Sequence, residues 1–296
     1  MKKMNNKIFL LIIIAFVLGC QKPGPVELID DKDDSKLIDI KSTGSVSDTL
    51  YAVSVGDTSG NFGPQNSRYY AKLIYQSIRF ERLSRKDSLI NAEAIFFDKD
   101  NSIKHNDRIV AFPSFDVGAL KINEDVLNKI PRRMMLPMRG DTLIGYRYQL
   151  RKNYELTTAN KWTATGSGSI DAFDISISSP PTIRVLNLPP RFINVSEPLN
   201  IKWDCANPII NIFISGEAGD LLTRRLVPVM HLQIRNKKGE VTIPVKILEL
   251  IPIKKFSRFV FSFVSESSGT VRISGYPEDV LVHSSSVHSI FLSVRP

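Results

Sequence analysis

Long apolar runs are scarce in this chain of 296 residues, and only residues 8–18 form one. As a helix this run would be about 17 Å long, well short of the roughly 30 Å hydrocarbon core of a bilayer. Its length therefore excludes it as a membrane span. Because lysines precede the run and Gly19 follows it, residues 1–19 are typical of a cleaved signal peptide.

An excess of charge of one sign is also lacking. The chain has 39 basic and 30 acidic side chains, and removal of residues 1–19, which hold three lysines and no acidic residue, leaves 36 basic against 30 acidic. The basic residues occur in scattered pairs such as Arg132–Arg133 and Lys254–Lys255, without a recognisable nucleic-acid-binding module. We therefore expect no nucleic-acid partner and interpret the pairs as solvated faces, with contact to anionic lipid headgroups as the lesser alternative.

Calcium-binding patterns are weak. Asp98, Asp100 and Ser102 have the alternate spacing of a calcium loop. However, Ile103 replaces the glycine and Ile109 replaces the closing glutamate that such a loop needs. The sequence therefore favours an exposed hairpin turn over a calcium site.

Other patterns for metals and cofactors are weak as well. Histidine occurs at positions 105, 231, 283 and 288, and the closest two are five residues apart, which suits neither a helical nor a strand-borne zinc site. Residues 166–169 lack the third glycine of a dinucleotide fingerprint and the order of a nucleophile elbow, so they predict a hairpin turn. We expect no metal and no cofactor.

The end of the apolar run is the most informative motif that is present. Val17, Leu18, Gly19 and Cys20 resemble the lipobox of bacterial lipoproteins. The resemblance implies that cleavage precedes Cys20, that its thiol receives a diacylglyceryl group, and that its acyl chains hold the protein at the membrane. Gln21 stands where the best-studied lipoproteins of the inner membrane carry aspartate, so the resemblance favours the outer membrane of a Gram-negative cell envelope. The leaflet that the protein faces stays open.

Residues 20–46 are interpreted as a flexible tether. Pro23, Gly24 and Pro25 precede a segment that mixes aspartates with lysines and has no sustained periodicity. A solvated chain of this length would hold a folded body about 25–30 Å from the membrane on average.

Period-two alternation of apolar and polar residues dominates the rest of the chain and predicts strands. In residues 199–205 the alternation places Trp203 and Cys205 on one face. With Cys20 acylated, Cys205 has no disulfide partner, and we expect it to be a small buried side chain there. Further strands are expected at 50–55, 92–97, 109–115, 146–150, 172–177, 259–263, 271–273 and 290–294, with turns at 237–239, 267–269 and 276–277 and a short helix at 123–129. Residues 69–83 fit a helix or a strand, and their tyrosines and isoleucines favour the strand.

Two proline pairs, Pro180–Pro181 and Pro189–Pro190, divide this series of strands. They predict one domain over 47–180 and another over 181–296, with residues 182–188 either a linker or the first strand of the second domain. The rhythm of residues 162–180 and 199–204 resembles that of envelope lipoproteins built from tandem immunoglobulin-like sandwiches, although the core disulfide is absent. We therefore expect a mainly-β fold of two antiparallel β-sandwich, immunoglobulin-like domains after the lipidated tether.

The sequence shows no catalytic constellation, which favours a non-enzymatic binding or structural role with an envelope protein or a glycan as partner. Two alternatives stay open. A cell-surface polymer hydrolase would need an acid and a base, for which the candidates are Asp171 with Asp174 and Glu278 with Asp279. A carbohydrate-binding accessory module would need exposed aromatic platforms, for which the candidates are Tyr69, Tyr70, Trp162 and Tyr276, residues that also suit a core or a sheet edge.

Overall fold

The computed structural model describes residues 37–43, 69–82, 85–105, 107–136, 140–153, 159–168, 170–187, 192–218, 225–256 and 258–295. Cys20, residues 20–36 and 44–46 of the tether and the strand expected at 50–55 lie outside these residues, so those predictions stay predictions. For residues 38–43 the predicted flexible tether is wrong, because they form a strand, β1, that pairs with β16. The described part is mainly β-strand, which confirms the predicted class. Its helix, α2, covers Val245–Leu248.

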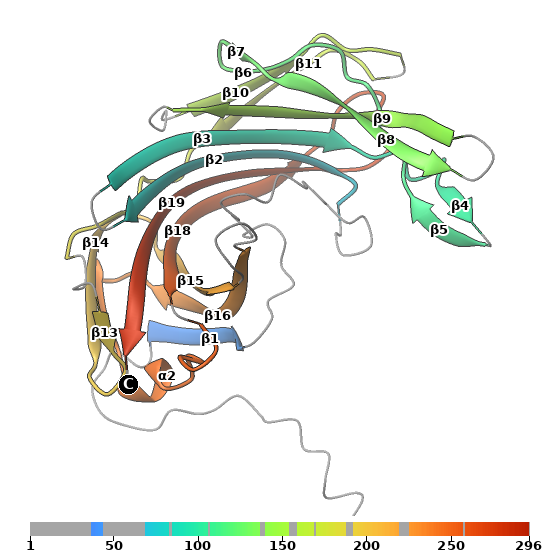
Figure 1. Ribbon diagram of the computed structural model, residues 1–296. Coiled ribbons are helices and arrows are strands. Elements are labelled where there is room, and N and C mark those ends of the chain that lie inside the picture. The colour runs from blue at the N-terminus through green and yellow to red at the C-terminus, as the bar shows by residue number, and fades with distance from the viewer. Residues whose placement is uncertain are drawn as a thin grey trace, which may run out of the picture. The chain divides into compact units, whose positions relative to one another are not determined.

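One mixed sheet of ten strands organises the described part (Figure 1). Its members are β1 (Ile38–Thr43), β2 (Ala71–Arg82), β3 (Arg85–Phe96), β8 (Asn128–Leu136), β9 (Gly140–Lys152), β13 (Phe192–Asn194), β15 (Ile209–Ala218), β16 (Arg225–Arg235), β18 (Phe259–Val271) and β19 (Val280–Arg295). The order is β1-β16-β15-β18-β19-β2-β3-β9-β8, and β13 pairs with the end of β19. Neighbours are antiparallel except that β19 runs parallel to β2 and to β13.

Three small sheets accompany the large one. The first has the order β11-β10-β6-β7, the second β12-β14-β17, and the third is the β4-β5 hairpin. Their bounds are β4 (Ile103–His105), β5 (Arg108–Ala111), β6 (Leu120–Ile122), β7 (Asp125–Val126), β10 (Ala159–Ala164), β11 (Phe173–Ser178), β12 (Arg184–Val185), β14 (Leu199–Asp204) and β17 (Glu240–Ile243).

Two of the small sheets pack on the same face of the large sheet. We call this face A, and it carries Leu73 of β2 and Val282 of β19, which are opposite each other in the parallel register. At one end of face A these residues share a buried core with Trp162 of β10. At the other end the ring centroid of Trp203 of β14 lies 6.4 Å from that of Phe263 of β18. The long strands β18 and β19 therefore serve both cores (Figure 1).

Most strand predictions are confirmed by the element bounds. The ambiguous segment 69–83 contains β2, and the segments 92–97, 146–150, 172–177, 199–205, 259–263 and 290–294 fall largely within β3, β9, β11, β14, β18 and β19. The helix predicted at 123–129 is wrong, because a turn, β7 and the start of β8 occupy it. The turn predicted at 267–269 is also wrong, because β18 continues through it, paired with residues 282–284 of β19.

The arrangement of the two halves differs from the expectation of purely antiparallel sandwiches. Strands from before and after residue 180 join one sheet through the parallel pair β19 and β2, which are more than 190 residues apart in sequence. Parallel neighbours cannot be joined by a tight hairpin, and this chain meets that requirement by pairing its first long strand with its last. Residues 182–188 contain β12, which pairs with β14. The boundary near residue 180 stays a prediction.

Candidate functional site

The carboxylates that the sequence offers to a hydrolase lie at the surface. Their partners are Lys161 for Asp174 at 2.5 Å, Lys99 for Glu278 at 3.0 Å and Arg272 for Asp279 at 2.8 Å, and the hydroxyl of Ser274 donates to Asp171. Exposed ion pairs of this kind contribute little to stability and keep both groups solvated. They supply no acid held in an apolar site, which a glycoside hydrolase needs.

The aromatic candidates for a sugar platform are largely inside the fold. Trp162 is fully buried, and Tyr276 is 4% exposed with its hydroxyl donating to the Phe97 carbonyl at 2.9 Å. Tyr70 is half-buried and meets Phe112 edge-on. The interpretation of Trp162 and Tyr276 as core residues is confirmed, so neither offers a face to a glycan.

The predicted turns and isolated histidines have local roles. The Asp98 carboxylate accepts hydrogen bonds from the backbone and side-chain amides of Asn101 at 3.0 and 2.7 Å, closing the turn before β4. His283 and His288 lie on opposite faces of β19, because their separation is odd. Within the described ranges, no group of three or more His, Cys, Asp or Glu side chains is placed to hold a metal ion.

Cys205 differs from its prediction. It lies one residue beyond the end of β14 and is half-buried rather than buried. Its thiol lies 3.6 Å from the carbonyl oxygen of Pro181. The strand ends earlier than the alternation suggested because Asp204 is the last residue paired, through Arg184 of β12.

A buried polar belt crosses face A between its two apolar ends. We define the belt as the buried residues Ser284, Ser286 and His288 of β19 and Glu81 of β2, together with half-buried Arg79 of β2. The parallel register sets His288 opposite Arg79. His288 is fully buried and Glu81 is 7% exposed, which is unusual for a carboxylate. Of these residues the sequence singled out only His288, as one of four isolated histidines.

The belt holds the chain segment that enters β12. The backbone amide of Ile183 donates to the Ser286 hydroxyl at 3.1 Å, and that of Val185 donates to His288 Nδ1 at 2.8 Å. On its other side, His288 Nε2 lies 3.3 Å from Glu81 Oε1, which also accepts from Arg79 Nε at 3.2 Å. The belt thus satisfies two backbone amides that burial would otherwise leave without partners.

The pKa of His288 is consistent with a structural role for the belt. Burial lowers the pKa of His288 to about 4, although Glu81 opposes the shift. The ring is therefore neutral near pH 7, as it must be for Nδ1 to accept the Val185 amide. Because His288 is fully buried, it is placed to dock backbone rather than to exchange protons with a substrate.

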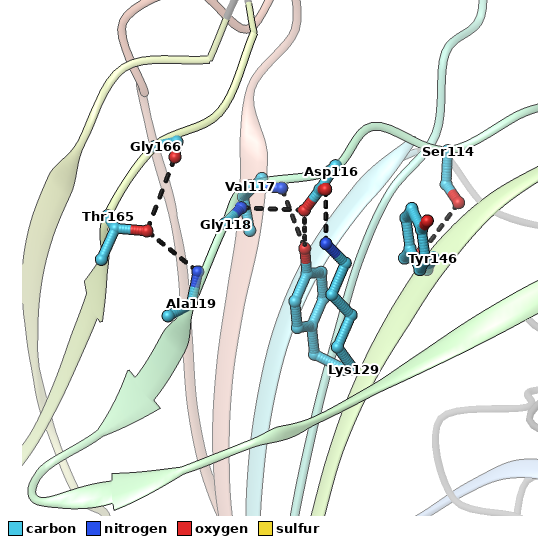
Figure 2. Close-up of polar contacts among 10 residues, drawn as sticks. Ser114, Asp116, Val117, Gly118, Ala119, Lys129, Tyr146, Thr165 and Gly166 are labelled. Atoms are coloured by element: carbon cyan, nitrogen blue, oxygen red, sulfur yellow. Dashed lines mark hydrogen bonds and ion pairs between the residues drawn. The ribbon is translucent and has the colours of Figure 1, made fainter.

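A second polar cluster fixes the loop between β5 and β6 (Figure 2). The Asp116 carboxylate accepts from the Tyr148 hydroxyl at 2.8 Å and the Gly118 amide at 2.9 Å, and it pairs with Lys129. The Tyr148 hydroxyl in turn accepts from the Val117 amide at 2.9 Å. Partial burial works to raise the pKa of Asp116, but the Lys129, Gly118 and Tyr148 hydrogen bonds outweigh it and hold the pKa below its usual value. Burial raises the pKa of Tyr148, so its hydroxyl stays a donor.

The same loop is held at both ends. Thr165 Oγ1 accepts from the Ala119 amide at 2.9 Å, and the Ser114 hydroxyl donates to the Tyr146 carbonyl at 2.7 Å (Figure 2). Ser114 also donates its backbone amide to the Ile144 carbonyl at 2.8 Å. These contacts seat the loop on β9 and so fix the base of the β4-β5 hairpin that precedes it.

Exposed apolar side chains occur together at a pair of β-hairpin ends. We call it the hairpin end: the β4-β5 hairpin together with residues 132–135 of β8 and 141–143 of β9. Nine large apolar side chains are exposed among the described residues, and the hairpin end contains four of them: Ile109 at 41%, Val110 at 41%, Leu143 at 44% and Met135 at 74% exposed. Exposed apolar groups gathered in one place are typical of an interaction site.

Basic side chains accompany these apolar groups. Lys104 and Arg108 are exposed on β4 and β5, and Arg133 is exposed on β8, where it pairs with Asp141 at 3.0 Å. Arg132 donates to the Phe112 carbonyl at 3.1 Å and lies over the Phe97 ring at 4.7 Å, which joins β8 to the chain that leaves β5. The sequence shows the Arg132–Arg133 pair and predicts a strand at 109–115, but it gives no signal that basic and apolar side chains are exposed together here.

Comparisons with protein-family models, curated proteins and solved structures find no match for this chain. No helix among the described residues is long and apolar enough to cross a membrane.

Proposed function

We propose that this chain is a lipid-anchored protein of the outer membrane with a non-enzymatic binding role. In this proposal Cys20 carries the acyl chains, and two β-sandwich modules share the large sheet and present the hairpin end to a partner. The observation that supports a binding role is the exposure of Ile109, Val110, Met135 and Leu143 beside basic side chains.

The polar groups of the described residues argue in the same direction. The belt around His288 and the cluster around Asp116 are occupied in holding backbone, and the candidate hydrolase carboxylates are solvated in ion pairs. A carbohydrate-binding role has less support, because Trp162 and Tyr276 lie in the core.

Anchoring is tested by replacing the cysteine that would carry the lipid. We expect Cys20→Ala to leave the membrane fraction after an alkaline carbonate wash, while the wild-type protein stays, because two or more acyl chains hold far more strongly than surface contact. Cys205→Ala is the matched control, since it removes the other cysteine and leaves the lipobox intact.

The wash matters because it removes proteins that are held only by surface contacts. Retention of Cys20→Ala through the wash would refute lipid anchoring at this residue. The mass of the N-terminal peptide gives an independent reading, since acylated Cys20 adds the mass of its acyl groups.

A further inference from the structure

We propose that the hairpin end is a second, peripheral membrane-binding surface, which inserts Ile109, Val110 and Met135 among lipids and sets Lys104 and Arg108 against anionic headgroups. This inference rests on the proposed function, because it takes the protein to be tethered beside a membrane.

The first argument is the construction of the β4-β5 hairpin. It is a two-stranded sheet of its own and adds no strand to a larger sheet. Ile109 is opposite Lys104 in the hairpin, whereas Val110 is the unpaired residue at a register shift, and both side chains are exposed. A lone hairpin has little stability in water, and apolar side chains without a core do not add to it. An apolar medium around the hairpin would bury both residues at once.

The second argument is that the exposed apolar side chains of the β8-β9 hairpin lie beside the β4-β5 hairpin. The contacts of Arg132 with Phe112 and of Ser114 with Ile144 tie the chain that leaves β5 to the ends of β8 and β9. Met135 and Leu143 are exposed in these ends. Figure 1 shows both hairpins at the same side of the large sheet. The apolar groups thus form one surface drawn from two hairpins.

The third argument is charge. Lys104, Arg108, Arg132 and Arg133 belong to the hairpin end, against the acidic Asp107 and Asp141. Basic side chains around exposed apolar ones suit a surface of anionic headgroups over hydrocarbon. A lipid anchor also holds the hairpin end close to the membrane and so raises its effective concentration there. A contact that would be weak for the unanchored protein is then sufficient to keep the hairpin end on the lipid surface. These features favour lipid over a protein partner.

The test uses the processed chain, residues 20–296, with Cys20→Ala, so that no acyl chain contributes. Binding is measured by sedimentation with vesicles of phosphatidylglycerol and phosphatidylethanolamine, and with phosphatidylcholine vesicles for comparison. We expect binding to the anionic vesicles that weakens as salt is raised, because salt screens exposed charges.

Two variants with matched controls locate the contact. We expect Ile109→Asp with Val110→Asp to lower the partition coefficient about tenfold or more, since two apolar side chains are lost from the lipid contact. Lys104→Glu with Arg108→Glu should abolish the preference for anionic vesicles. The controls are Leu250→Asp, at a residue 49% exposed near α2, and Lys246→Glu on α2, and both should bind as the parent does. Circular dichroism confirms that each variant is folded.

Insertion itself is measured with a fluorophore. In a Cys205→Ala background, Val110→Cys carries an environment-sensitive dye, and its emission should shift to the blue on anionic vesicles while a dye at Leu250→Cys does not shift.

Equal binding by the hairpin variants and their controls, or absence of binding to anionic vesicles at low salt, overturns the inference. A protein captured stoichiometrically by a crosslinker at Met135, with no vesicle binding, would assign the surface to a protein and also overturn it. Either result leaves the carbonate test of Cys20 anchoring unaffected.

Discussion

At the scale of single residues, His288 makes the stability of the folded protein depend on pH. Its folded-state pKa of about 4 lies below the ordinary value of 6.5, because burial disfavours the charged ring. The unfolded chain therefore binds more protons than the folded chain between these two values. The contribution of His288 to stability is complete above about pH 6.5 and is lost as the pH falls towards 4.

The predicted effect is a loss of about 2 kcal/mol in the free energy of unfolding between pH 7.5 and pH 5. Urea denaturation at the two pH values measures it. His288→Asn, whose amide oxygen takes the position of Nδ1 and can still accept the Val185 amide, should show a smaller dependence, whereas exposed His105→Asn should follow the wild type. A pH dependence of His288→Asn equal to that of the wild type would show that other groups cause the loss.

At the scale of elements, β9 depends on one glycine where the Ser114 loop crosses it. Gly145 has a φ of 119°, and a Cβ there would lie 2.1 Å from the Ser114 carbonyl oxygen. Gly140, at the start of the same strand, has a φ of 65° with open space around its Cβ position. A comparison of substitutions at the two glycines therefore separates the cost of steric overlap from the cost of a left-handed backbone.

We predict that Gly145→Ala lowers the free energy of unfolding by about 3 kcal/mol or more, because strain and overpacking act together. Gly140→Ala should cost about 1 kcal/mol, the ordinary penalty of a left-handed backbone. Thermal or urea denaturation of both variants gives the comparison. Similar losses in the two would mean that the loop moves aside easily and that its contacts with β9 are weak.

Two of the strands were predicted correctly from the alternation of apolar and polar residues. The alternation in 199–204 and 259–263 predicted strands with a buried face, and Ile201, Trp203, Phe259, Phe261 and Phe263 are buried. The helix at 123–129 failed because Asn123 takes a φ of 52°, which starts a tight turn between β6 and β7. Asparagine tolerates this conformation, so a local signal existed.

Long-range pairing explains the other failures. Ser267, Ser268 and Gly269 resemble a turn, but β19 supplies their backbone partners and carries β18 through them. The belt and the hairpin end were missed for the same reason. Burial of His288 depends on β2 and on residues 183–185, and exposure of Ile109 depends on β4-β5 standing outside the large sheet. Neither the burial of His288 nor the exposure of Ile109 can be predicted from the residues that are near it in sequence.

At the scale of the whole described part, the shared sheet determines how the two halves respond to stress. Residues 280 and 282 of β19 belong to the core around Trp162, while residues 288–292 of the same strand pair with the β18 phenylalanines near Trp203. The belt between the cores is hydrogen-bonded rather than empty, since Ser286 and His288 hold residues 183 and 185. Loss of either core would leave long strands with one exposed face.

We therefore predict a single cooperative unfolding transition for residues 36–296. Trp162→Ala and Trp203→Ala each remove a buried indole and should each cost about 3–5 kcal/mol. Both should shift the same transition, followed by far-ultraviolet circular dichroism and by exchange of backbone amides in the two halves. Two separate transitions, with each variant shifting only one, would instead identify independent sandwiches divided near residue 180. Coincident shifts would mean that β18 and β19 transmit the loss of one core to the other.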